Sequence, residues 1–272
     1  MKLSEIYKIA DGFAPKALSD EYCRNFGAYD NSGTLVDAGE EITGILFSLD
    51  LTFAALDEAI EKGYNLIITH HPSMYGKINH ARCDADDLTE RKLVKALRNG
   101  ISVISMHLNL DMAKGGIDES LMKGISLAAN ETEGAGTSSP SIMHSVADGG
   151  YGRNYAVKPI ALAQLKENMK KIFSTDRILV YGDENKTIHR VASFCGAGGD
   201  ENAILFAKRN GADVVVSADF KHHVLMFAIE SGLSVIAMTH YASENYGFKN
   251  YYEKIRRQVE IPCAFHTDTE LL

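Results

Sequence analysis

The chain alternates between short apolar runs rich in Val and Ile and longer segments whose apolar residues recur at helical spacing. The apolar runs predict strands, and the segments between them predict helices. Strands are expected over residues 41–49, 65–69, 101–106, 177–180, 190–194, 214–217 and 234–238. Helices are expected over residues 3–10, 15–22, 52–62, 88–99, 115–129, 161–173, 201–210, 223–231 and 244–259. This alternation, with mostly short turns, predicts an α/β fold with parallel strand pairs.

Two helix–glycine–strand segments in the first half resemble two in the second half. Residues 59–71 (AIEKGYNLIITHH) resemble residues 207–219 (AKRNGADVVVSAD). Residues 96–107 (ALRNGISVISMH) resemble residues 228–239 (AIESGLSVIAMT). Any two helix–turn–strand units share some pattern, but the aligned glycines and the near-identity of ISVISM and LSVIAM favour an internal duplication.

One segment between the two halves has the composition of a linker. Residues 130–140 (NETEGAGTSSP) are rich in Gly, Ser and Thr. At 272 residues the chain is long enough for one large domain or two of ordinary size. We therefore expect a first α/β unit over residues 1–130 and a second over residues 131–272, with the C-terminal segment able to pack back on the first.

Composition narrows the class of protein. With 45% hydrophobic and 24% charged residues, the chain lies in the soluble globular range. No apolar run approaches the ~20 residues that span a bilayer, and acids and bases mix through residues 1–13, so a cytoplasmic location is expected. The formal net charge of −8 argues against a surface for duplex DNA. The four cysteines are far apart and form no CxxC, which argues against a thiolate zinc site and a disulfide framework.

Residues able to bind metal follow the carboxyl ends of four predicted strands. These residues are His70 and His71, then His107 with Asp111, then Asp219 with His222 and His223, and finally His240 with Glu244. In an open α/β sheet, ligands bind at that edge. Ten histidines scattered at random would not favour it. The pattern therefore predicts a metal site.

The pair His70–His71 leaves two geometries open. Adjacent side chains on a strand point to opposite faces, so either the strand ends at His70 or the two rings serve two different ions. Imidazoles and carboxylates without thiolate suit zinc, iron, manganese or nickel. The candidate ligands also exceed the three of a typical one-metal catalytic site. They suit two ions, as in hydrolytic metal clusters.

Other polar residues receive simpler interpretations. His144, His189 and His266 are interpreted as core histidines, and His80 as an exposed loop residue. The glycine-rich segment 195–200 (CGAGGD) lies between a predicted strand and helix, where a turn can cradle a phosphate. It lacks the third glycine of the dinucleotide fingerprint, so a Rossmann cofactor site is not expected.

Seven segments together resemble a known family. They are YDNSGTLV (29–36), LIITHHP (66–72), HLNLDMAKGG (107–116), GYGR (150–153), FCGAGG (194–199), SADFKHH (217–223) and HYASE (240–244). In this order they resemble the dinuclear-metal-centre proteins called GTP cyclohydrolase I type 2 homologues, or NIF-three-like (NIF3-like) proteins. The resemblance spans nearly the whole chain.

The resemblance implies a fold, an assembly and a ligand set. The fold would be two duplicated three-layer α/β/α units with the metal site in the cleft between them, and the assembly a toroidal homohexamer. The implied ligands of two divalent ions are His70, His71, Asp111, His240 and Glu244, with Glu244 bridging. His107 and His223 would line the same cleft as the catalytic residues. Departures at Tyr29, 217–218 and His222 bear on substrate preference more than on metal binding.

Two classes of function follow. The first hypothesis is a metal-dependent hydrolase whose nucleophile is a metal-bridging hydroxide, with His107 or His223 handling the proton. Its substrate would be a nucleotide or another small phosphorylated or heterocyclic molecule. The alternative is a non-enzymatic metal-binding regulatory or scaffold protein that acts through protein partners. A metal store or chaperone is a third hypothesis.

Overall fold

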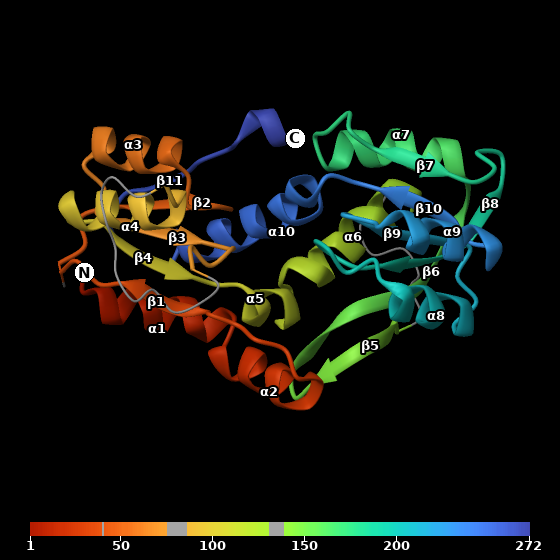
Figure 1. Cartoon of the computed structure of the whole chain (residues 1–272), viewed down its shortest axis with the longest axis horizontal. Coiled ribbons are helices and arrows are strands. Elements are labelled where there is room, and N and C mark those ends of the chain that lie inside the picture. Colours follow the sequence, from red (N-terminus) through yellow and green to blue (C-terminus); the bar gives the residue numbers. More distant parts are fainter. Residues whose placement is uncertain (40, 75–85, 131–138) are drawn as a thin grey trace. The chain divides into compact units, whose positions relative to one another are not determined.

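The computed structural model describes residues 1–39, 41–74, 86–130 and 139–272. The chain forms two compact units (Figure 1). The first comprises Met1–Ala113 and Phe248–Thr267, and the second comprises Lys114–Gly247 and Asp268–Leu272. Most of the predicted linker lies outside the described residues. Among the described helices, none is long and apolar enough to cross a membrane.

The first unit is built on a five-stranded sheet. Its helices are α1 (Leu3–Phe13), α2 (Lys16–Phe26), α3 (Phe53–Lys62), α4 (Leu88–Arg98) and α5 (Leu108–Met112). Its strands are β1 (Gly33–Val36), β2 (Ile45–Ser48), β3 (Leu66–Thr69), β4 (Ser102–Ser105) and β11 (Cys263–Phe265). The strand order is β1-β4-β3-β2-β11, in which only the edge strand β1 is antiparallel to its neighbour.

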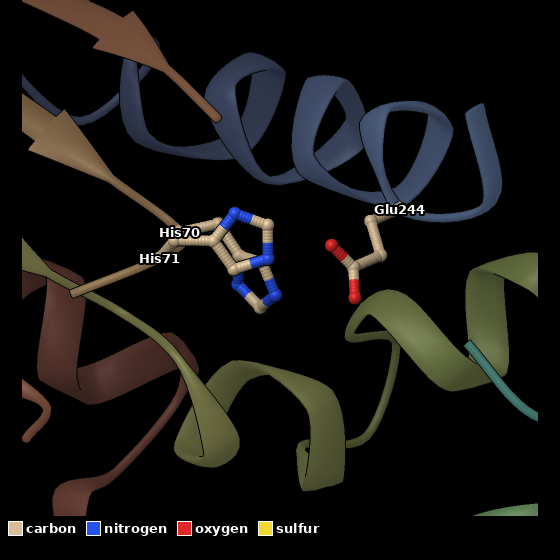
Figure 2. A group of neighbouring side chains, drawn as sticks. All are labelled: His70, His71 and Glu244. Carbon is tan, nitrogen blue, oxygen red and sulfur yellow. The ribbon is translucent and has the colours of Figure 1, made fainter. Parts of the chain in front are cut away.

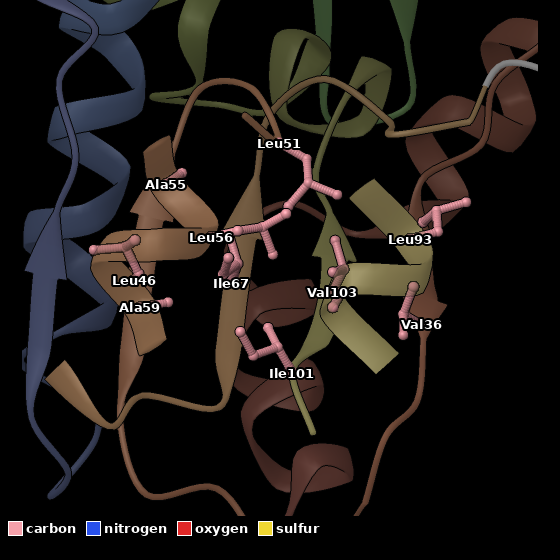
Figure 3. Close-up of a cluster of buried hydrophobic side chains, with 11 residues drawn as sticks. Val36, Leu46, Leu51, Ala55, Leu56, Ala59, Ile67, Leu93, Ile101 and Val103 are labelled. Atoms are coloured by element: carbon pink, nitrogen blue, oxygen red, sulfur yellow. The ribbon is translucent and has the colours of Figure 1, made fainter. Parts of the chain in front are cut away.

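Both faces of this sheet are covered. On one face, α3 and α4 pack over the strands, and Leu56 and Leu93 join Ile67 in the buried cluster of Figure 3. On the other face, Phe47 of β2 contacts the aromatic residues of helix α10 (His240–Ile255), including Phe248 at 6.1 Å between ring centroids. Strands buried on both faces read as continuous apolar runs, which explains the patterns of β2 and β3.

The second unit is built on a six-stranded sheet. Its helices are α6 (Ile117–Asn130), α7 (Leu162–Ile172), α8 (Glu201–Arg209), α9 (His222–Glu230), the start of α10, and a short 3₁₀ turn, η1 (Thr269–Leu271). Its strands are β5 (Ser141–Val146), β6 (Gly149–Ala161), β7 (Leu179–Tyr181), β8 (Thr187–Ser193), β9 (Val214–Ser217) and β10 (Ser234–Ala237). The order is β5-β6-β8-β9-β10-β7, with β8, β9 and β10 parallel. Helices α8 and α9 pack over these three strands in a second buried cluster.

The two units repeat one arrangement. In each, three parallel strands are joined through two helices, and an antiparallel edge strand, β1 or β7, pairs with the third of them. The four glycines that end the joining helices are all left-handed. They are Gly63 (φ 67°), Gly100 (φ 64°), Gly211 (φ 68°) and Gly232 (φ 81°). A side chain strains this conformation, so the aligned glycines have the same physical cause in both halves, as a duplication predicts.

The α/β prediction is confirmed, and the differences are local. The segment 149–153, for which no strand is predicted from the sequence, is the start of the long strand β6. Its glycines hid the strand pattern, although they are required there: at Gly152, a Cβ would lie 2.6 Å from the Phe194 ring. The strands β1, β5 and β11 and the five-residue helix α5 were not predicted. Helix α10 begins at His240, one turn earlier than expected.

Candidate metal centre

The end of β3 brings His70 and His71 to one side of the chain. The strand ends at Thr69, and the backbone N–H groups of both histidines donate to the Leu49 carbonyl, at 3.1 and 3.0 Å. The two rings therefore lie beside each other, with centroids 4.8 Å apart (Figure 2). Of the two geometries left open by the sequence, the structure has the strand end before His70.

His70 is fully buried and its ring orientation is fixed by the backbone. Its Nδ1 lies 2.8 Å from the carbonyl oxygen of Met106. Because a carbonyl only accepts, Nδ1 carries the proton and Nε2 is the lone-pair nitrogen of the neutral ring. Nε2 lies 3.5 Å from Oδ1 of Asp111, which is also buried.

His71 and His107 are oriented by carboxylates. Nδ1 of His71 lies 2.8 Å from Asp50, and Nδ1 of His107 lies 2.8 Å from Asp30. Burial by itself raises the pKa of Asp30, but hydrogen bonds from His107 and Ser32 outweigh it and lower the pKa to about 2. An ionised carboxylate on Nδ1 again makes Nε2 the nitrogen that each neutral ring offers to a cation.

The short helix α5 places Asp111 next to the imidazoles. It begins directly after His107, and the Asp111 N–H donates to the His107 carbonyl at 3.0 Å. The His107 ring lies 5.3 Å from the His70 ring and 5.9 Å from the His71 ring. Ligand atoms of His70, His107 and Asp111 all lie within 4.8 Å of one another. The first unit therefore gathers three imidazoles and a buried carboxylate.

The second unit places a His–Glu pair on α10. Nε2 of His240 lies 3.1 Å from Oε1 of Glu244, one helical turn later, and Glu244 is buried. Nδ1 of His240 lies 2.5 Å from Asp219. The backbone of Gly196 lies against this His–Glu pair. The Gly196 N–H donates to the Ser243 hydroxyl at 3.0 Å. His240 thus has the same Nδ1–carboxylate orientation as His71 and His107.

These groups fit a divalent metal ion. Zinc binds histidine nitrogen and carboxylate oxygen at about 2.0–2.2 Å, so two ligands of a tetrahedral ion lie roughly 3.4 Å apart. The His70–Asp111 and His240–Glu244 separations of 3.5 and 3.1 Å are close to this edge length. Buried carboxylates also require charged or hydrogen-bonding partners.

Comparison with known proteins decides the family. The family model for Duf34/NIF3 (NGG1p interacting factor 3) matches residues 1–270. The chain belongs to this family.

Relatives and solved structures agree with this assignment. A protein of Clostridium acetobutylicum named GTP cyclohydrolase 1 type 2 homolog is 30% identical over 252 residues, which cover 90% of this chain and 85% of the relative. Reduced HcgD from Methanocaldococcus jannaschii is 26% identical, with a TM-score of 0.78 and 97% of each chain covered. A Bacillus cereus protein related to NIF3 is similar in fold, with 21% identity, a TM-score of 0.74 and 98% of each chain covered.

Among the site residues predicted from the sequence, His223 differs from the others because its side chain is largely exposed. It lies in the first turn of α9 with its side chain 63% exposed, and its Nε2 pairs with Glu201 at 3.0 Å. His222 beside it is exposed as well. His189, interpreted as a core residue, is in fact on the surface, because its side chain turns outward from β8. His144 and His266 are partly buried, and His80 lies outside the described residues.

Two orienting carboxylates were missed at the sequence level. Neither Asp50 nor Asp30 is among the metal-binding residues predicted from the sequence. Asp50 precedes helix α3, whose N-cap Thr52 accepts from the Ala55 N–H. Asp30 lies in the segment 29–36. For Asp50 the signal was present, because it lies two residues after the end of β2, at the same edge of the sheet as His70 and His107.

Proposed function

We propose that this protein is a metal-dependent hydrolase that holds two divalent ions and acts on a nucleotide or another small phosphorylated or heterocyclic molecule. One observation carries the proposal: four imidazoles each have Nδ1 against a carbonyl or carboxylate oxygen. The rings and acceptors are His70 with Met106, His71 with Asp50, His107 with Asp30 and His240 with Asp219. This arrangement presents Nε2 as the ligand atom of every ring. The relatives' name, GTP cyclohydrolase 1 type 2 homolog, supports a nucleotide substrate.

The proposed ligands are His70, His71, Asp111, His240 and Glu244. Although the strand end before His70 brings both rings to one side, each ring would bind a different ion, with Glu244 between them, because the five proposed ligands exceed the three of a typical one-metal catalytic site. Helix α10 supports the place of Glu244, since it runs without a break from the second unit into the first. Glu244 stands one turn before Phe248, whose ring lies 6.2 Å from the His70 ring.

Divalent ions in such a site lower the pKa of water to near neutrality and polarise a substrate oxygen. The residues of the chain supply positioning and proton handling. His107 is the better of the two predicted proton-handling residues, since its ring lies against the other imidazoles and Asp30 fixes its tautomer. His223 is exposed on α9 and pairs with Glu201, so its proposed role is contact with the substrate.

Metal content and turnover test the proposal together. Protein purified without added metal is assayed by elemental analysis, then loaded with zinc, iron, manganese or nickel and incubated with a panel of nucleotides. We expect two ions per chain and turnover that H71A and E244A each abolish. H189A is the matched control, because it removes an exposed imidazole. Equal turnover by H71A, E244A and wild type would contradict the proposal, and two bound ions without turnover would favour the regulatory alternative.

The homohexamer and the cytoplasmic location also stay predictions. Native mass spectrometry of the metal-loaded protein gives the number of chains directly. A mass equal to six chains is the expected result, and a monomer would contradict it.

A further inference from the structure

Asp219 has a left-handed backbone, which Asp adopts more readily than most residues with a side chain. It follows the last residues of β9 with φ 51°, and among the described residues only Ser174 shares this conformation without being glycine. The left-handed region is costly for a residue with a side chain, at about 1 kcal/mol. The Asp219 side chain is 54% exposed, so burial does not hold it in place. Its carboxylate lies 2.5 Å from Nδ1 of His240.

The duplication shows which residue Asp219 replaces. After β3, the His70 N–H donates to Leu49 at the end of β2. After β9, the Ala218 N–H donates to Gly196 beyond the end of β8, at 3.0 Å. Ala218 and Asp219 therefore occupy the positions of His70 and His71. Where the first unit places two imidazoles, the second places a methyl group and a carboxylate.

We propose that Asp219 is a positioning residue for His240. Its carboxylate accepts from Nδ1 and so sets the tautomer and the plane of the ring. This orientation directs Nε2 to Glu244, 3.1 Å away. The inference rests on the proposed function, since it gives His240 a metal to bind. Asp50 and Asp30 orient His71 and His107 from residues with ordinary φ, whereas Asp219 does so from a strained one.

Because the backbone of Asp219 is strained, substitution by glycine can distinguish a positioning role from a purely structural one. If Asp219 were only a turn residue, glycine would serve as well or better, because glycine adopts positive φ without strain. If Asp219 positions His240, glycine relieves the strain and loses the carboxylate. Folding stability and metal affinity then change in opposite directions.

The experiment compares D219G, D219N and D219A with S174G as the matched control. Ser174 is exposed and has φ 52°, so S174G removes the same strain away from the candidate ligands. The readouts are the thermal midpoint of metal-free protein, zinc stoichiometry and affinity by chelator competition, and the visible spectrum of the Co²⁺ form.

We expect D219G and S174G to match or exceed the wild-type midpoint without metal. Only D219G and D219A should lose affinity for one ion, by roughly 10- to 100-fold, with a changed Co²⁺ spectrum. D219N offers an amide oxygen to Nδ1 and should recover most of the affinity. Wild-type binding of two ions by all three variants would overturn the role of Asp219 alone. If the wild-type protein itself bound no ions, the proposed function would fail.

Discussion

Gly196 shows how closely the backbone approaches a candidate ligand pair. It adopts φ 56°, and its carbonyl accepts from the Ala218 N–H and the Ser217 hydroxyl at 3.0 and 3.1 Å. A Cβ at this position would overlap Oε1 of Glu244 and would lie 3.1 Å from Nε2 of His240. The loop is tied to β9 and α10, so it has little room to retreat. The absence of a side chain at this position therefore lets the Glu244 carboxylate and the His240 ring keep their places.

We expect G196A to weaken zinc binding at least tenfold, because the added methyl group must displace the Glu244 carboxylate. The change should also cost about 1 kcal/mol of folding stability through the positive φ. G211A is the matched control: Gly211 has φ 68° with nothing within 4 Å of an added Cβ. Chelator competition and urea unfolding measure both effects. Wild-type zinc affinity in G196A would contradict the prediction.

Cys263 gives a prediction about pH. Burial raises the pKa of its thiol to about 11, although Arg256 lowers it in part. At pH 8 about one thiol in a thousand would then be ionised, and only the thiolate reacts. Iodoacetamide labelling of Cys263, followed by peptide mass spectrometry, should accelerate about tenfold per pH unit up to about pH 11. The urea-unfolded protein is the control and should level off near pH 9. A plateau below pH 9.5 in the folded protein would refute the assignment.

At the residue scale, the sequence predicted the positions of the candidate ligands better than the groups that hydrogen-bond to them. The residues that follow strands at one edge of a sheet are His70, His71, His107 and Asp111. Finding them requires only a prediction of where each strand ends. The orienting acceptors come from backbone carbonyls and loops, as with Met106 for His70. The Met106 carbonyl and the Asp30 carboxylate depend on the folded path of the chain, so no local pattern identifies them, whereas Asp50 and Asp219 follow strands as the candidate ligands do.

At the scale of elements, one buried carboxylate connects a helix, a strand and a loop. Asp118, in the first turn of α6, pairs with Arg153 of β6, and both are buried. The same carboxylate accepts from the N–H groups of Gly152 and Cys195, at 3.0 and 3.2 Å. It therefore ties helix α6 to β6 and to the glycine-rich loop that carries Gly196.

Loss of this carboxylate should be strongly destabilising. D118A leaves the Arg153 charge buried without its partner, which typically costs 3–5 kcal/mol. K123Q is the comparison, because it breaks the exposed Glu119–Lys123 pair of the same helix and should cost about 0.5 kcal/mol or less. Urea unfolding gives both values. Equal costs for the two variants would show that burial of the Asp118 pair does not matter.

Elements with local signals were predictable, and those without were not. Helix α3 has Thr52 as its cap and Gly63 as its end, and its predicted range of 52–62 is within one residue of the structure. Strand β6 depends on long-range pairing with β5 and β8. Its glycines are explained only by what lies against them in the folded chain, which is the Phe194 ring at Gly152 and the His144 carbonyl at Gly150. The short edge strand β11 is likewise defined by its pairing with β2.

At the scale of the molecule, duplication placed related strand ends in both units and then let them diverge. The first unit carries His70, His71 and Asp111, and the second carries His240 and Glu244. The repeat was readable from sequence because its glycines and strands are local. The path of α10 from one unit to the other was not readable from sequence. The spacing of apolar residues along a helix does not show against which core the helix packs.

The last prediction tests whether residues of both units serve one metal centre. Zinc at 100 times its Kd should stabilise the protein by about 2.7 kcal/mol per site, or roughly 5–10 °C for a chain of this length. H71A removes a ligand of the first unit and E244A one of the second. If the two residues share a centre, the double variant should lose little more zinc stabilisation than either single variant, with a coupling energy of roughly 1–3 kcal/mol. H71A combined with H189A is the control and should show additive effects. Additive losses for H71A and E244A would mean that the two units bind metal independently.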